Sequence, residues 1–176
     1  MLAQTQTVDT PIGKLDFELG VPTKETVTKL YDAMDLQRAC QLYLWAQPLV
    51  GFEQLRAIQE GSAGARPGEV VIYKGYRNVL VFFTPNVTTP YMFSYLDLAK
   101  TGPVVMDMPV GPTAGSVMDF WQRALTDLGL PGPDQGKGGK YVFVGPGQEA
   151  PAAEGAVVFR SATFGVVIFC YVCEVC

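Results

Sequence analysis

Residues 86–147 read NVTTPYMFSYLDLAKTGPVVMDMPVGPTAGSVMDFWQRALTDLGLPGPDQGKGGKYVFVGPG, and this stretch carries the clearest structural signal in the chain. Near its start, Tyr91, Phe93 and Tyr95 alternate with other side chains. Alternation with a period of two is typical of a β-strand, in which every second side chain faces the same side of the sheet. The stretch therefore predicts a strand whose aromatic residues share one face.

The residues around this strand predict an α+β chain. On the N-terminal side, Thr23 is predicted to cap a helix over residues 24–34, and Asp35 is predicted to cap a second helix. Pro48 should kink or interrupt the second helix, whose apolar face continues to Gly61. Further strands are predicted at 70–73, 79–83, 104–108, 141–144, 156–159 and 164–172, whereas 117–128 predicts a short helix or a strand followed by a helix. Helices followed by strands indicate N-terminal helices packed on a mostly antiparallel β-sheet or sandwich, in one domain over residues 1–176.

Composition excludes several classes of function. The net charge is −4 and the basic residues are scattered, so the sequence predicts no nucleic-acid partner. There is no histidine, which rules out Ser-His-Asp catalysis and histidine-containing metal sites within this chain. No apolar run is long enough to span a membrane, and no cofactor is predicted. A homo-oligomer stays open.

The N-terminal residues MLAQTQTVDTPIG are not a signal peptide, because they lack both a basic segment and an apolar segment. They read more like a mature N-terminus whose export signal has been removed. The expected location is periplasmic or secreted if a signal peptide was lost, and cytoplasmic otherwise.

Several short motifs follow one another along the chain: CQLYLWAQPLV at 40–50, YLDL at 95–98, GPVV at 102–105, MDFW at 118–121, GKGGKY at 136–141 and RSATF at 160–164. In this order and spacing they resemble a family of proteins of unknown function, DUF1254. The resemblance covers about residues 10–169. It implies a bacterial protein, often exported, that usually continues into a second domain of unknown function, DUF1214. It supplies no catalytic residues.

The C-terminal residues depart from the family pattern. The chain ends CYVCEVC, whereas the family strand normally runs on toward the second domain. The sequence therefore predicts a truncated or altered C-terminus and an absent C-terminal partner domain. Cys170, Cys173 and Cys176 have a spacing that iron–sulfur or zinc sites use, but a continuing strand would turn Cys173 away from the other two. The preferred interpretation is that these cysteines belong to a fortuitous or altered terminus and form no metal site.

Carboxylates and aromatic residues supply the candidate site. Asp97, Asp107 and Asp119 are candidates for acid–base catalysis or for a hard cation such as calcium, although a strand or turn role explains each of them as well. Tyr91, Tyr95 and Trp121 are candidate ligand-binding residues, because aromatic rings suit sugar or lipid pockets; a packed core explains the same pattern.

The GKGGKY segment differs from a phosphate-binding loop, because Lys137 is followed by Gly138 and a predicted strand rather than by Ser or Thr and a helix. A tight connection between elements is the better interpretation. The expected function is a binding or structural role in an exported bacterial protein. The alternative is a hydrolase-like enzyme that uses carboxylates and tyrosines near residues 91–119.

Overall fold

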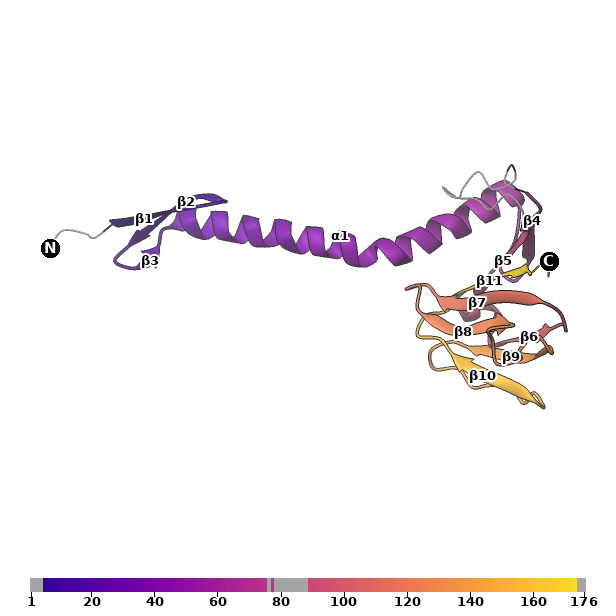
Figure 1. Cartoon of the computed structure of the whole chain (residues 1–176). Coiled ribbons are helices and arrows are strands. Elements are labelled where there is room, and N and C mark those ends of the chain that lie inside the picture. Colours follow the sequence, from indigo (N-terminus) through magenta and orange to yellow (C-terminus); the bar gives the residue numbers. More distant parts are fainter. Residues whose placement is uncertain (1–4, 76, 78–88, 174–176) are drawn as a thin grey trace. The chain divides into compact units, whose positions relative to one another are not determined.

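The computed structural model describes residues 5–75, 77 and 89–173, so the predicted strand at 79–83 lies outside the described residues. The chain forms two compact units, residues 1–47 and 48–176, coloured from indigo to yellow along the sequence in Figure 1. The single domain expected from the sequence stays a prediction.

The first unit holds a small antiparallel sheet and the start of a helix. Strands β1 (Thr5–Thr10), β2 (Gly13–Glu18) and β3 (Val21–Pro22) pair in that order, and helix α1 (Lys24–Ala63) follows. The predicted N-cap is confirmed, because Thr23 Oγ1 accepts a hydrogen bond from the Thr26 amide at 3.2 Å. The buried Thr26 hydroxyl donates to the Asp16 carbonyl at 2.9 Å, which joins the helix start to β2.

The prediction of two separate N-terminal helices divided at Asp35 is wrong, because α1 is one helix that contains both Asp35 and Pro48. The boundary between the units falls just before Pro48. Proline removes one backbone donor from a helix, but its carbonyl can still accept a hydrogen bond. Here the Pro48 carbonyl accepts one from Gln122 Nε2 at 3.0 Å. Asp35 does not start a new helix and instead forms an ion pair with Arg38 at 3.6 Å, one turn further along.

The second unit contains two β-sheets. One has the order β4-β5-β11-β7-β8 and the other β10-β9-β6. The bounds are β4 Val70–Tyr73, β5 Tyr91–Asp97, β6 Val104–Met108, β7 Thr113–Asp119, β8 Ala124–Gly129, β9 Gly139–Val144, β10 Ala156–Arg160 and β11 Gly165–Val172, with the short helix α2 (Leu98–Thr101) after β5. Among the described strand pairs only β9 and β10 are parallel. The α+β class and the mostly antiparallel pairing are confirmed.

The helix expected within 117–128 is replaced by the hairpin of β7 and β8. Asp119 explains this turn, because its Oδ1 accepts hydrogen bonds from the backbone amides of Trp121 at 2.9 Å and Arg123 at 3.1 Å. Gln122 adopts a positive φ of 59° within the turn. A side chain that satisfies turn amides reverses the chain before a helix can continue.

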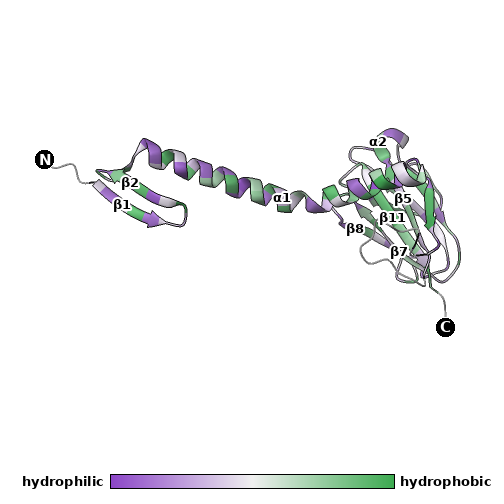
Figure 2. Ribbon diagram, turned by 90° about the horizontal axis from the view of Figure 1, so that it is seen from above, coloured by the Kyte–Doolittle hydropathy of each residue, from purple (hydrophilic) through white to green (hydrophobic). Residues whose placement is uncertain are grey.

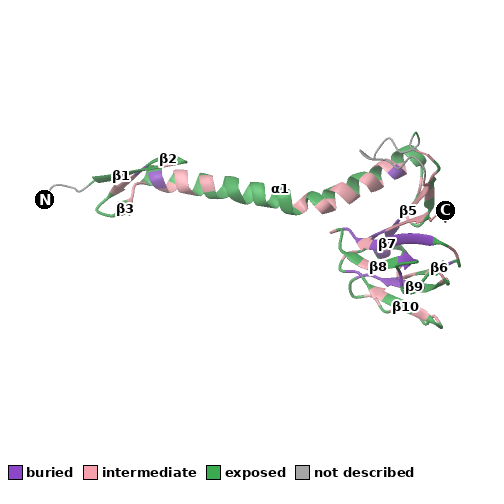
Figure 3. Cartoon of the chain, viewed as in Figure 1, coloured by how far each residue is buried: buried purple, intermediate pink, exposed green. Residues whose placement is uncertain are grey.

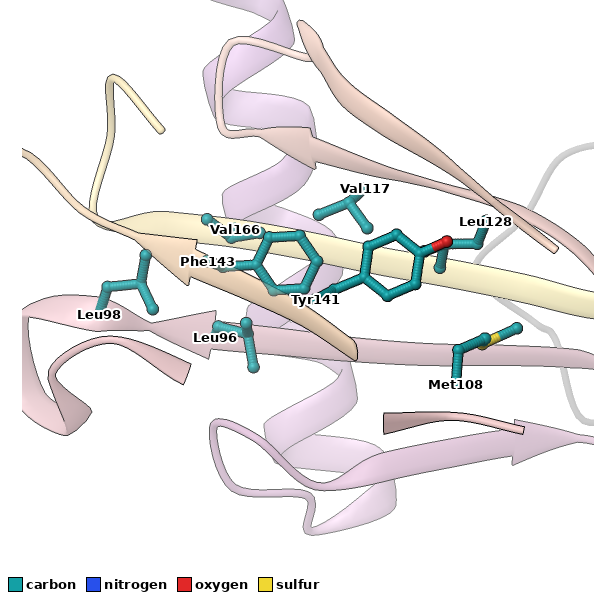
Figure 4. Close-up of a cluster of buried hydrophobic side chains, with 8 residues drawn as sticks. All are labelled: Leu96, Leu98, Met108, Val117, Leu128, Tyr141, Phe143 and Val166. Atoms are coloured by element: carbon teal, nitrogen blue, oxygen red, sulfur yellow. The ribbon is translucent and has the colours of Figure 1, made fainter. Parts of the chain in front are cut away.

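Both sheets contribute to one buried apolar cluster. Its members are Leu96, Leu98, Met108, Val117, Leu128, Tyr141, Phe143 and Val166 (Figure 4). Figure 3 shows that buried residues concentrate in the strands of this unit. Burying side chains of this size is the main stabilising contribution to the fold.

Candidate functional site

The aromatic alternation in β5 is confirmed as one sheet face. Tyr91, Phe93 and Tyr95 lie opposite Tyr171, Phe169 and Val167 of β11 in the strand register. Leu49, Phe52 and Leu55 of α1 pack against part of this face, where they meet Tyr95, Phe120 and Val167. In Figure 2 the strands β5 and β11 under this part of α1 are coloured mainly as hydrophobic. The apolar side of α1 therefore covers part of this sheet face, as in a hydrophobic core.

A cavity of about 320 Å³ opens beside this packing, and we call it the polar-rimmed cavity. It is lined by Leu49, Glu53, Arg56, Pro67, Tyr95, Leu96, Asp97, Lys100, Phe120, Thr163 and Gly165. Its volume lies within the range of small-molecule sites, at the small end. Two of the candidate residues from the sequence, Tyr95 and Asp97, are among its walls.

Two ion pairs form the polar part of the rim. Arg56 contacts Glu53 through two hydrogen bonds, one of them at 2.8 Å from Nε to Oε2, and it also pairs with Glu60 one turn further along α1. Lys100 Nζ lies 2.8 Å from Asp97 Oδ2. Hydrogen bonds from these cations lower the pKa of Glu53 and of Asp97 below their usual range. Both carboxylates are therefore held ionised at neutral pH.

Tyr95 provides a neutral polar group next to these charges. The residue is only 5% exposed, and burial raises the pKa of its phenol well above the ordinary value. Because a buried phenol loses the hydration that stabilises its charged form, Tyr95 stays protonated and retains an O–H donor.

The contacts of Asp119 indicate a structural role. Its side chain is 2% exposed, and Oδ2 accepts from Arg123 Nε at 2.8 Å and lies 2.7 Å from Arg123 Nη2. With its other oxygen on two turn amides, the carboxylate is fully engaged in holding the β7–β8 turn. This arrangement favours the structural interpretation of Asp119.

The three candidate aspartates do not converge. In the register of β11, Asp97 lies opposite Gly165 and Asp119 opposite Val166, so their side chains face opposite sides of the sheet. Asp107 is exposed on β6 of the other sheet, opposite Lys140. Among the described residues, no group of three or more Cys, Asp or Glu side chains is arranged to hold a metal ion.

The remaining candidates lie away from the polar-rimmed cavity. Tyr91 makes edge-to-face contacts with Phe93 and Tyr171, and Trp121 lies in the β7–β8 turn. Neither is among the described residues that line the cavity. Cys170 is half-buried in β11 and Cys173 follows that strand, while Cys176 lies outside the described residues.

The backbone of the GKGGKY segment passes close to the backbone at Met108 and leads into β9. Gly136 and Gly138 have φ values of 72° and 76°, which favour glycine. A Cβ at Gly138 would lie 2.8 Å from the Met108 carbonyl oxygen. These glycines are explained by backbone geometry, in agreement with the connection predicted from the sequence.

Sequence reasoning missed three residues of the rim, Glu53, Arg56 and Lys100. A signal existed for them, because opposite charges three and four residues apart on a helix lie side by side. The spacing of Glu53, Arg56 and Glu60 fits this rule, as does Asp97 with Lys100. What the sequence could not show is that Arg56 of α1 and Asp97 of β5, 41 positions apart in the chain, line the same cavity.

Comparison with known proteins gives a family and a fold. A crystal structure of the VPA0106 protein from Vibrio parahaemolyticus has a similar fold, with a TM-score of 0.56 at 14% sequence identity. The similarity covers 76% of this chain and 32% of that chain, so this chain spans about a third of the solved protein. A comparison with curated proteins found no match. Among the described residues, no helix is both long and apolar enough to cross a membrane. The profile of the family described as proteins of unknown function, DUF1254, matches residues 69–172, and the chain belongs to this family.

Proposed function

We propose that residues 48–176 are a small-molecule binding module and that the ligand occupies the polar-rimmed cavity. The observation that carries this proposal is the pairing of fixed charges with an apolar floor. Glu53, Arg56, Asp97 and Lys100 form the rim, and Phe120 and other apolar side chains form the floor. Mostly apolar pockets with a few placed polar groups are typical of ligand sites.

The charges favour binding over catalysis. General acid–base catalysis with two carboxylates needs one of them to keep its proton near neutral pH, which requires a raised pKa. Here the pKa values of both Glu53 and Asp97 are lowered by their cationic partners. Asp119, which could have served as a second acid beside Asp97, faces the other side of the sheet. The hydrolase-like alternative therefore has less support.

The balance of charge indicates the class of ligand. The lining residues include two acids and two bases, so the cavity has no net charge to select an anion or a cation. Paired acidic and basic groups offer acceptors and donors side by side, and aromatic rings offer flat apolar contact. A neutral polyhydroxylated molecule such as a mono- or disaccharide matches this combination.

We further propose that the chain acts with a C-terminal partner domain in an exported bacterial protein. Support comes from the VPA0106 comparison, in which this fold accounts for only 32% of the longer chain. Further support comes from α1, whose residues Leu42, Leu44 and Trp45 are 60%, 68% and 63% exposed. Exposed apolar side chains in such number are typical of surfaces that contact a partner. The two sheets sharing one buried cluster support a β-sandwich as the scaffold.

A ligand screen tests the binding proposal. The chain would be incubated with a panel of neutral mono- and disaccharides, and with acidic and basic metabolites of similar size, and binding would be detected by NMR chemical-shift changes. The expected result is that neutral sugars bind and that Asp97→Asn weakens their binding at least tenfold, whereas Asp107→Asn, outside this cavity, leaves it unchanged. Binding that Asp97→Asn does not alter would refute the assignment of the site.

A further inference from the structure

We propose a second ligand site, which shares only the wall residue Leu96 with the polar-rimmed cavity and binds an elongated, uncharged apolar molecule such as a medium-chain alcohol. The site is a cavity of about 300 Å³, here called the methionine-lined cavity. Its walls include Met92, Ser94, Met106, Met108, Ile168 and Cys170.

The walls are apolar and adaptable. Three of them are the thioethers of Met92, Met106 and Met108, which come from β5 and β6. Methionine is unbranched and polarisable, so it adjusts to ligands of different outline better than branched side chains do. Such walls suit a flexible hydrocarbon more than a rigid polar molecule.

The arrangement of the walls gives the cavity its length. Met92, Ser94 and Leu96 are alternate residues of β5 and so lie on one face, and Ser94 and Met92 are paired with Ile168 and Cys170 of β11. From Met92 to Leu96 the strand rises about 13 Å at about 3.3 Å per residue. A linear molecule matches a site of this length and volume better than a compact one does.

The polar groups of the cavity exclude a charged head group. Asp107 is the only ionisable residue among the described walls apart from the Cys170 thiol, and no Lys or Arg is present to pair with a carboxylate. An unpaired charge in an apolar site is strongly unfavourable. Asp107 alternates with Met106 and Met108 along β6, so its carboxylate faces the other side of the strand and does not neutralise or bind a head group inside the cavity. The buried Ser94 supplies a hydroxyl for a neutral polar end.

The cavity is open to solvent on one side and adjoins the buried cluster on the other. Val70 and Val105 in its wall are 60% and 44% exposed, whereas Met106, Ile168 and Cys170 pack against the buried cluster. An apolar molecule that displaces water from such a surface is stabilised by the hydrophobic effect.

Cys170 provides a direct test, because its thiol lies in the wall of the cavity. The full chain would be labelled with methyl methanethiosulfonate, with and without 1-decanol, and the modified cysteine would be identified by peptide mass spectrometry. Burial raises the pKa of the Cys170 thiol, so the reaction would be run at mildly alkaline pH. We expect 1-decanol to slow labelling of Cys170 at least fivefold, with saturation, and to leave labelling of the exposed Cys40 unchanged.

Two controls make the outcome decisive. Sodium decanoate at the same concentration should protect Cys170 much less, and equal protection would overturn the argument from charge. The Asp97→Asn variant should keep full protection by 1-decanol, because Asp97 is not a wall of this cavity. Labelling of Cys170 that 1-decanol does not slow, or equal slowing at Cys40, would overturn the site itself.

Discussion

Asp97 and Asp119 lie on the two strands that flank β11, yet their carboxylates face opposite sides of the sheet. The register places Asp97 opposite Gly165 and Asp119 opposite Val166, and adjacent strand positions point in opposite directions. Asp97 therefore lines the polar-rimmed cavity, while Asp119 holds a turn. Two carboxylates that are near in sequence have two separate roles.

Replacing Asp119 should destabilise the second unit. Asp119→Ala removes a buried carboxylate that accepts two backbone amides and an Arg123 ion pair, so unfolding free energy should fall by about 2–4 kcal/mol. Urea unfolding monitored by circular dichroism measures this change. Asp107→Ala, on an exposed strand position, should change stability by no more than about 0.5 kcal/mol, and an equal loss for both variants would contradict the structural role of Asp119.

The pKa of Asp97 should depend on Lys100. The hydrogen bond from Lys100 lowers the pKa of the Asp97 carboxyl below its ordinary value, so Lys100→Gln should raise it. A carboxyl with a lowered pKa stabilises the fold at neutral pH, and this contribution is lost as the pH falls through the folded-state pKa. Carbon-detected NMR titration of the Asp97 carboxyl measures the shift, and an identical pKa in the variant would refute the coupling.

Alkaline pH should lower the stability of the fold through ionisation of Tyr141. Burial, together with the hydrogen bond that its phenol donates to Asp134 Oδ1 at 2.5 Å, raises the pKa of Tyr141 to about 12. A raised pKa stabilises the fold fully below the unfolded-state value, and this stabilisation is lost between about pH 10 and 12. Tyr141→Phe should remove that part of the alkaline destabilisation, as measured by unfolding at pH 9 and above, whereas an unchanged pH profile would contradict the assignment.

Two glycines should respond in opposite ways to alanine. A Cβ at Gly115 would lie 2.2 Å from the Phe169 carbonyl oxygen, so Gly115→Ala should lower the unfolding free energy by about 3 kcal/mol or more. At Gly61, in α1, nothing lies within 4 Å of the added atom, so Gly61→Ala should raise helix stability by up to about 1 kcal/mol. Thermal unfolding of the two variants tests the β7–β11 packing, and a tolerated Gly115→Ala would contradict it.

Local patterns predicted much of this fold. The alternation at Tyr91–Asp97 and the β-branched residues of Val104–Met108 predicted strands that the structure contains. The errors were local: Asp119 formed a turn where a helix was predicted, and α1 runs on through Asp35, where a second helix was predicted to begin.

The candidate site was only partly visible in the sequence. Tyr95 and Asp97 were named, but Glu53 and Arg56 reach the same cavity from α1 through packing of Leu49 and Phe52 on the sheet. Contacts between segments this far apart depend on tertiary packing, which periodicity does not encode.

Isothermal titration calorimetry shows whether the polar-rimmed cavity binds a neutral small molecule. The neutral sugar that binds best in the screen would be titrated into the unaltered chain and into the Asp97→Asn, Arg56→Met and Asp107→Asn variants. We expect saturable binding at one site per chain, weakened at least tenfold by the first two substitutions and unchanged by the third. Equal affinity in all four proteins, or no saturable heat from any neutral sugar in the panel, would refute binding in this cavity.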